Sequence, residues 1–205
     1  MQTEKFLLKM NDASEIAVNR WIPESEEDIK AVIVFSHGMQ EHSLRYDRIG
    51  SIFAENGFVF NAHDHRGHGK TAQNAEQNGT GMFGKLADKN GFEIATEDLA
   101  EVIKEVKNDF PGKKIILLSH SFGSFVAQNY IQKYGSEIDA CILSGTSIYK
   151  KNYAIGSLIT KIAIAVKGPD FKSKFIQNIA FYGYNDRFKN ENDEYSWLYA
   201  YSANR

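Results

Sequence analysis

The sequence is poor in cysteine and proline: its 205 residues include one cysteine, Cys141, and three prolines. A single cysteine excludes an internal disulfide and is typical of proteins in a reducing compartment. Cys141 lies in the apolar run I-D-A-C-I-L, where we expect a buried thiol with no chemical role. These features predict a cytoplasmic protein.

Long apolar runs and blocks of like charge are also absent. The N-terminus, M-Q-T-E-K-F-L-L-K-M-N-D, has no apolar stretch of the length that a signal peptide needs. The most apolar later run, residues 154–166, carries Lys161 and is too short to span a bilayer, so we predict no membrane span. The net charge is −2, which gives no electrostatic reason to expect nucleic acid or an anionic membrane as a partner.

Patterns of buried strands and of helices alternate through the first 146 residues. A-V-I-V-F-S-H-G and F-V-F-N-A-H-D are continuous apolar runs, as in strands covered on both faces. Short links between strands and helices favour a mainly parallel, doubly wound α/β sheet. The predicted strands are 4–10, 15–21, 31–38, 58–64, 114–118 and 138–143, and the predicted helices are 46–56, 93–110 and 122–134. After Thr146 helical periodicity takes over, and no further buried strand is predicted.

The stretch I-I-L-L-S-H-S-F-G-S, residues 115–124, leads from a buried strand into a small polar turn. A serine at a sharp turn from strand to helix holds its Oγ clear of the backbone, and the helix directs free N–H groups to the same point. The turn requires small residues two before and two after the serine. Ser119 and Gly123 are both small, although Ser119 departs from the usual G-x-S-x-G pattern. These residues alone make Ser121 either a nucleophile or a helix N-cap.

A second loop, S-H-G-M-Q-E-H-S-L-R-Y, follows the third predicted strand. Gly38 lets the backbone pass close to the strand ends and can present the N–H of Met39 toward Ser121. Together with the N–H of Phe122, that group forms a two-donor oxyanion hole. A turn that simply needs Gly38 explains the same residues, so this loop alone decides nothing.

A third loop, H-D-H-R-G-H-G-K-T, begins at His63 and raises the question of a metal site, because His63 and His65 share one face of an extended chain. No cysteine lies nearby, and two glycines with Arg66 favour a tight loop held by hydrogen bonds. We expect Asp64 and Arg66 to pair within it. We therefore predict neither a metal nor a cofactor.

Taken together, the motifs H-G-x-x-E-H-S-x-R-Y, D-x-R-G-H-G and x-H-S-x-G, each after a buried strand, resemble the α/β-hydrolase superfamily. More narrowly, they resemble its monoacylglycerol lipase and lysophospholipase-like branch, also described as serine aminopeptidase-like hydrolases. The segments G-M-F-G-K-L-A-D-K-N-G-F-E and K-G-P-D-F-K-S-K-F extend this resemblance over essentially the whole chain.

This resemblance implies roles for particular residues. Ser121 is the nucleophile, and Met39 and Phe122 are the backbone oxyanion donors. Residues 1–146 are the N-terminal portion of the hydrolase core, and residues 147–205 are part of a helical cap, or lid, over the acyl site. Three of the histidines shape loops and take no part in catalysis, namely His37, His65 and His68.

The chain lacks a general base where this chemistry needs one. In α/β-hydrolases the triad follows the order Ser, Asp or Glu, His, but the six histidines, at 37, 42, 63, 65, 68 and 120, all precede Ser121. His120 points to the opposite face from its neighbour, and no spacing supports His42. The candidate acids Asp170, Asp186 and Asp193 lie in the cap-like stretch. We therefore expect an N-terminal fragment with about six of eight strands, nearly inactive by the triad route.

Three functions remain open. The leading one is hydrolysis of carboxylic esters, with monoacylglycerol-like or lysophospholipid-like acyl substrates, through an acyl-enzyme on Ser121. The second is a non-catalytic module that binds a lipid or a partner, and the third is an aminopeptidase-type serine hydrolase. The expected contacts are a small acyl ester, transient contact with lipid, and self-association through the uncovered edge of the sixth strand.

Overall fold

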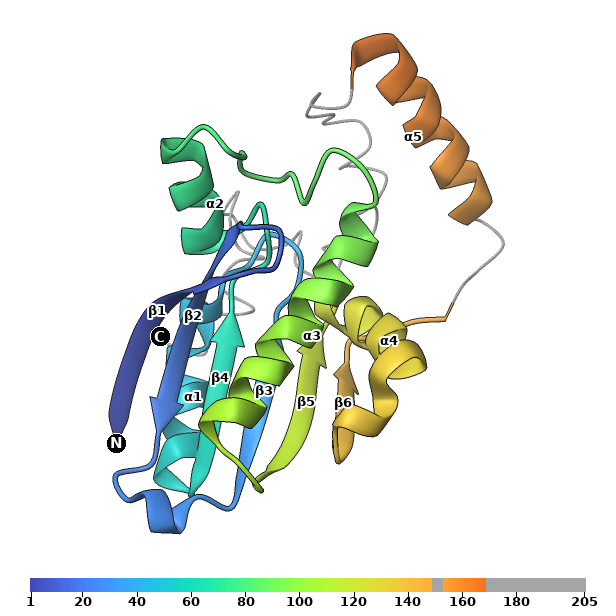
Figure 1. The fold of residues 1–205 in the computed structure, drawn as a ribbon. Helices are drawn as coiled ribbons and strands as arrows, with labels where there is room; N and C mark the ends of the chain where they lie inside the picture. Colours follow the sequence, from blue (N-terminus) through green and yellow to red (C-terminus); the bar gives the residue numbers. More distant parts are fainter. Residues whose placement is uncertain (149–152, 169–205) are drawn as a thin grey trace, which may run out of the picture. The chain divides into compact units, whose positions relative to one another are not determined.

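The computed structural model of the chain describes residues 1–148 and 153–168 (Figure 1). The chain divides into two compact units, Met1–Ile148 and Tyr149–Arg205. The described residues of the second unit form one helix, α5 (Tyr153–Lys167). No helix in the described ranges is long and apolar enough to cross a membrane.

The first unit is built on one six-stranded sheet with the order β1-β2-β4-β3-β5-β6. The pairs β1–β2 and β2–β4 are antiparallel, and β4–β3, β3–β5 and β5–β6 are parallel. The predicted α/β sheet is therefore confirmed, with every predicted strand present. The strands are β1 (Gln2–Lys9), β2 (Glu15–Ile22), β3 (Ala31–Ser36), β4 (Phe58–His63), β5 (Lys114–His120) and β6 (Ala140–Ser144).

Helices cover both faces of this sheet (Figure 1). The apolar stripes of α3 and α4 pack on one face, with Leu99 and Tyr130 among the buried side chains, and α1 packs on the other face against Trp21 and Phe60. The four helices are α1 (Asp47–Glu55), α2 (Gly69–Gln77), α3 (Gly91–Asp109) and α4 (Phe122–Tyr134). Three short 3₁₀ segments complete the unit, at Glu26–Asp28, Ser43–Tyr46 and Gly135–Glu137.

Helix α2 is not among the helices that the sequence predicts. Its segment, G-K-T-A-Q-N-A-E-Q, contains no large apolar residue, and it buries only Thr71 and Ala72. An apolar stripe is the main sequence signal for a helix, and this helix has almost none.

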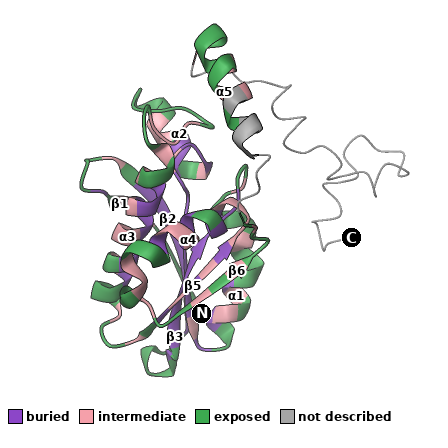
Figure 2. Ribbon diagram, turned by 90° about the vertical axis from the view of Figure 1, so that its right-hand side faces the viewer, coloured by how far each residue is buried: buried purple, intermediate pink, exposed green. Residues whose placement is uncertain are grey.

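The middle and the edge of the sheet differ in burial (Figure 2). Every residue of β3 is buried, whereas β6 alternates between exposed and half-buried residues, and Ile142 is 53% exposed. Among the described residues β6 pairs with β5 alone. Cys141 is consequently half-buried rather than buried, and this burial raises the pKa of its thiol. Self-association through this edge remains a prediction.

Candidate active site

Ser121 lies between the carboxyl end of β5 and the start of α4, with φ 48° and ψ −116°. A positive φ costs a residue with a Cβ roughly 1–3 kcal/mol, so it persists only where the surrounding contacts hold it. The N–H of Ser121 donates to Ser144 O at 2.9 Å. Its carbonyl accepts from Ser124 N–H at 2.9 Å and from Ser124 Oγ at 2.6 Å. The turn is thus held from one side by β6 and from the other by the first turn of α4.

The residues two before and two after the serine are small for different reasons. A Cβ on Gly123 would lie 2.1 Å from Ser36 O, so only glycine lets α4 approach the end of β3 this closely. Ser119 is fully buried, and its Oγ donates to Ile142 O at 3.1 Å. Serine fits where glycine is usual because the neighbouring strand accepts its hydrogen bond.

The loop after β3 comes directly against the serine at Gly38. A Cβ on Gly38 would lie 3.3 Å from Ser121 Cβ. In the described part of the chain, neither the N–H of Met39 nor that of Phe122 donates a hydrogen bond to a protein acceptor. Two unpaired donors therefore belong to the two segments that meet at the serine, and their role as an oxyanion hole stays a prediction.

The side chain of His37 connects the Gly38 loop to the loop that follows β4. It is fully buried, its Nδ1 donates to Gly38 O at 2.7 Å, and its Nε2 accepts from His65 N–H at 3.1 Å. One neutral tautomer, with the proton on Nδ1, satisfies both bonds. The ring centroid lies 4.5 Å from that of His65 and 5.4 Å from that of His68. The loop that carries Gly38 therefore rests on the histidine loop after β4.

Burial keeps these histidines uncharged. It lowers the pKa of His37 to about 4 and that of His63 to about 3, and it holds the pKa of His65 well below its ordinary value. Both ring nitrogens of His63 lack a hydrogen-bond partner among the described residues. No group of three or more His, Cys, Asp or Glu side chains in those residues could hold a metal ion.

The predicted pairing of Asp64 with Arg66 is wrong. The carboxylate of Asp64 accepts instead from Ser43 N–H and Ser43 Oγ, both at 2.6 Å, and from Lys70 N–H at 2.7 Å. Asp64 therefore accepts from two backbone N–H groups and one hydroxyl of two neighbouring segments, and these donors stabilise its charge without an arginine. Its contacts join the loop after β4 to the segment that follows the Gly38 loop.

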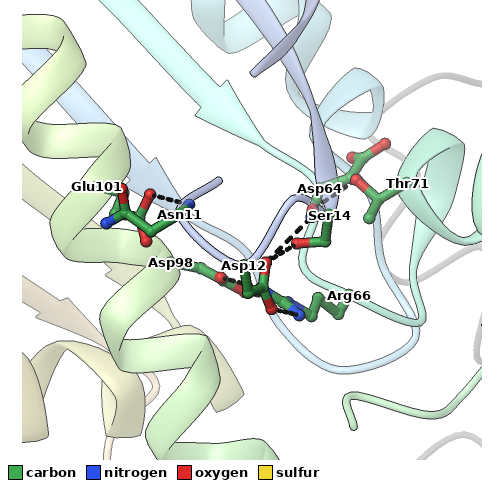
Figure 3. Close-up of polar contacts among 8 residues, drawn as sticks. All are labelled: Asn11, Asp12, Ser14, Asp64, Arg66, Thr71, Asp98 and Glu101. Carbon is green, nitrogen blue, oxygen red and sulfur yellow. Dashed lines mark hydrogen bonds and ion pairs between the residues drawn. The ribbon is translucent and has the colours of Figure 1, made fainter. Parts of the chain in front are cut away.

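Arg66 has other carboxylates as partners (Figure 3). Its Nε and Nη2 donate to Asp98 on α3 at 2.8 Å and 2.7 Å, and its Nη1 donates to Asp12 in the β1–β2 turn at 2.7 Å. The same turn is also tied to α3 by Asn11 N–H, which donates to Glu101 at 2.9 Å. The two predicted partners thus take part in separate networks.

The two remaining histidines do not supply a base in this structure. His42 is exposed, and Nδ1 of His120 lies 3.4 Å from Ser144 Oγ. No hydrogen bond joins Ser121 Oγ to any histidine in the described residues, which include all six. The candidate acids Asp170, Asp186 and Asp193 lie outside the described residues.

The sequence interpretation missed Glu41 and Tyr46 in the loop beside the serine. Glu41 Oε2 accepts from Gly38 N–H at 2.9 Å and from the Tyr46 hydroxyl at 2.6 Å. Both residues stand in the motif H-G-x-x-E-H-S-x-R-Y, and the spacing of the glutamate, three residues after a glycine, was the available signal.

The parallel run β4-β3-β5-β6, the serine turn before α4 and the glycine loop after β3 define an α/β-hydrolase. A thermostable carboxyl esterase from Bacillus coagulans, solved in complex with glycerol, has a TM-score of 0.78 and 26% identity, over 97% of this chain and 62% of that chain. A lipase in its open form, at 24% identity, has the same TM-score and covers 96% of this chain and 62% of its own.

The family profile described as serine aminopeptidase, S33 matches residues 27–203, and the chain belongs to that family. A monoacylglycerol lipase from Mycolicibacterium smegmatis is 32% identical over 133 residues, which are 65% of this chain and 43% of that protein. Human monoglyceride lipase is 31% identical over 98 residues, which are 48% of this chain and 29% of that protein. These matches confirm the resemblance to monoglyceride lipase-like hydrolases, and they span less than half of each relative.

Proposed function

We propose that the chain belongs to a serine hydrolase that cleaves carboxylic esters of the monoacylglycerol or lysophospholipid kind through an acyl-enzyme on Ser121. One observation carries the proposal: Ser121 is held at a positive φ while Gly38 packs against its Cβ. A helix cap needs neither of these features. The monoacylglycerol lipase relatives and a probable lysophospholipase from Haemophilus influenzae support this substrate class.

In the proposed reaction, a general base accepts the proton of Ser121 Oγ as this oxygen attacks the ester carbonyl carbon. The bond from that carbon to the alcohol oxygen then breaks, and the alcohol leaves with the same proton. The carbonyl oxygen becomes an oxyanion, which accepts hydrogen bonds from the unpaired N–H groups of Met39 and Phe122. The N-terminal end of α4 adds a favourable field at the same point. Loss of one donor from such a hole costs about 10²–10³ in rate. Water then hydrolyses the acyl-enzyme.

The general base in this proposal is a histidine other than the six that these residues contain. His37, His63 and His65 are buried and neutral, and none of the six forms a hydrogen bond with Ser121 Oγ in the described residues. In serine hydrolases, loss of the histidine lowers kcat by about 10⁶. We therefore expect residues 1–205 alone to acylate very slowly.

A fluorophosphonate probe tests the nucleophile. The probe is applied to the 205-residue chain and to any longer product of the same gene, with Ser121→Ala as the control, and mass spectrometry locates the adduct. We expect fast labelling of Ser121 in a longer form only. If no form is labelled, the hydrolase proposal fails, and the non-catalytic lipid- or partner-binding module replaces it.

The family's description supports a second candidate, a serine hydrolase that releases N-terminal amino acids from peptides. Monoacylglycerols, lysophospholipids and aminoacyl p-nitroanilides, given to the form that the probe labels, separate the two substrate classes. Release of fatty acid without release of p-nitroaniline supports the lipase-type reaction. The reverse result assigns the aminopeptidase.

A further inference from the structure

Glu41 lies in the loop that faces Ser121, and its side chain is only 14% exposed. One of its oxygens, Oε2, accepts both the hydrogen bond from Gly38 N–H and that from the Tyr46 hydroxyl, at 2.9 Å and 2.6 Å. The other oxygen, Oε1, lies 3.9 Å from Arg45 Nε. A single carboxylate thus connects the backbone beside the serine to a tyrosine five residues further along.

Tyr46 is fixed relative to the sheet, so it is suited to anchor this carboxylate. Its ring centroid lies 4.2 Å from that of Phe35 on β3, and the ring packs against the apolar core beneath α1. Burial, and after it the hydrogen bond to Glu41, raise the pKa of the Tyr46 hydroxyl above its ordinary value. The hydroxyl therefore stays protonated and remains a donor to Glu41.

Both polar backbone groups of Gly38 are occupied. Its N–H donates to Glu41 Oε2, and its carbonyl accepts from His37 Nδ1 at 2.7 Å. In a trans peptide the carbonyl and the following N–H point in opposite directions. Because the Gly38 carbonyl is directed at buried His37, the N–H of Met39 points away from His37. A Cβ on Gly38 would lie 3.0 Å from Glu41 Oε2 and 3.3 Å from Ser121 Cβ, so the carboxylate and the serine flank this peptide.

We propose that Glu41 is a positioning residue, which with Tyr46 as its anchor fixes the Gly38–Met39 peptide so that the Met39 N–H stays available to the oxyanion. The inference rests on the proposed acyl transfer at Ser121. Glu41 itself touches no reacting atom, and it acts through the backbone of Gly38.

The chain offers matched variants for the test. Glu41→Leu removes both hydrogen bonds, whereas Glu41→Gln keeps an acceptor oxygen where both donors meet. Glu97→Leu is the control, because Glu97 Oε2 on α3 accepts from the Tyr134 hydroxyl on α4 at 2.7 Å, a similar carboxylate–tyrosine bond outside the site.

The first measurement is amide exchange and the NMR signal of Gly38 and Met39 in the 205-residue chain. In Glu41→Leu we expect the Gly38 amide to exchange at least about 10-fold faster, since it loses its acceptor, and the Met39 signal to move. Glu41→Gln and Glu97→Leu keep both signals near those of the unmodified chain.

The second measurement is the rate of fluorophosphonate labelling in the form in which Ser121 reacts. Displacement of the oxyanion donor by about 1 Å predicts a loss of about 10²-fold in Glu41→Leu. Glu41→Gln should keep most of the labelling rate of the unmodified protein. In Glu41→Leu we expect kcat for ester hydrolysis to fall, with KM little changed.

Unchanged Met39 signals in Glu41→Leu overturn the proposal, whether or not Ser121 reacts. A loss of labelling shared equally by Glu97→Leu reports general destabilisation and also overturns it. If unmodified Ser121 is never labelled in any form, the proposed function fails. The amide signals then decide alone whether Glu41 fixes this peptide.

Discussion

Two groups of buried or half-buried polar side chains lie in the first unit, and they are stabilised in opposite ways. The paired arginines, Arg20 and Arg66, keep their charge, and each contacts two carboxylates. The neutral histidines, His37, His63 and His65, are fully buried and form no ion pair in the described residues. A buried charge must be either compensated or given up.

The difference follows from the proton chemistry of the two residue types. A guanidinium cannot lose its proton in a protein, so a buried arginine requires carboxylates around it. An imidazole gives up its proton near neutral pH, so burial alone makes it neutral. The arginines secure the β1–β2 hairpin to the rest of the unit through Asp109 and Asp12, whereas the histidines support the loops beside Ser121. The site region is therefore the acid-sensitive part of the unit.

The largest expected effect on the free energy of unfolding is that of a fall in pH, which should affect the histidines more than the arginines. Unfolded histidines have a pKa of about 6.5 and bind protons that the folded chain excludes. This contribution to stability is therefore fully present above pH 6.5, and it is lost as the pH falls toward about 4 for His37 and about 3 for His63. At pH 5.5, His37 and His63 together should lower the free energy of unfolding by about 3 kcal/mol. Urea unfolding at pH 7.5 and 5.5 measures the change.

Hydrogen exchange at pH 5.5 locates the same effect. We expect amides of residues 37–42 and 63–68 to lose protection before those of the β1–β2 hairpin. The hydrogen bond from Arg66 holds the pKa of Asp12 well below its usual range, so that contact stays charged in this window. Equal stability at the two pH values, or earlier opening of the hairpin, would contradict the comparison.

Loss of a paired arginine should lower the free energy of unfolding by less than acid does, and this loss should already be present at neutral pH. Arg20→Leu removes hydrogen bonds to Asn61, Glu4 and Asp109. We expect the free energy of unfolding to fall by about 2 kcal/mol, because the side-chain oxygen Oδ1 of Asn61 is left buried without its donor while both carboxylates can regain water. Urea unfolding at pH 7.5 measures this loss.

Glu4→Gln is the matched control for Arg20→Leu. The Glu4 side chain is 49% exposed, and such a pair contributes at most about 1 kcal/mol. If the free energy of unfolding fell equally in both variants, the buried Arg20 would contribute no more to stability than its exposed ion pair with Glu4.

The smallest expected effect has the opposite sign. Both ring nitrogens of His63 are buried without a partner in the described residues. His63→Leu should therefore raise the free energy of unfolding by about 1 kcal/mol at pH 7.5, and it should weaken the acid dependence. His65→Leu is the contrasting control, since His65 Nε2 shares a 3.1 Å hydrogen bond with Ser36 Oγ, and it should destabilise. Destabilisation by His63→Leu would contradict the expectation that the unpaired ring nitrogens of His63 lower the stability of the fold.

Much of the fold can be predicted from the sequence, because continuous apolar runs mark the buried strands and a helical stripe marks α3. The helix predicted over 122–134 is observed with those bounds. Helix α2 could not be predicted, since it is held by Ala17 N–H donating to Thr71 Oγ1 and by Asp64, and by no apolar stripe. Local periodicity contains no signal for such tertiary contacts.

For the site, the positions of the loops could be predicted but the side-chain partners could not. Gly38 and Ser121 meet because parallel strands bring their carboxyl ends to one edge of the sheet. Arg66 binds Asp98 and Asp12, which are 32 and 54 residues away, rather than the nearby Asp64. The choice among carboxylates depends on which one the folded backbone brings within reach.

The bond from Ser121 N–H to Ser144 O has a consequence for the order of folding. Together with the bond from Ser119 Oγ to Ile142 O, it ties the serine turn to β6, and the two residues in each of these bonds are 23 positions apart in the chain. Of the two sets of hydrogen bonds that hold Ser121 at its positive φ, the set from α4 is local, and the set from β6 forms only after β6 has docked on β5. The serine turn therefore gains its full set of hydrogen bonds only after the β5–β6 pairing, which is the last strand pairing along the chain among the described residues. A change that weakens the pairing of β6 with β5 should thus loosen the serine turn as well.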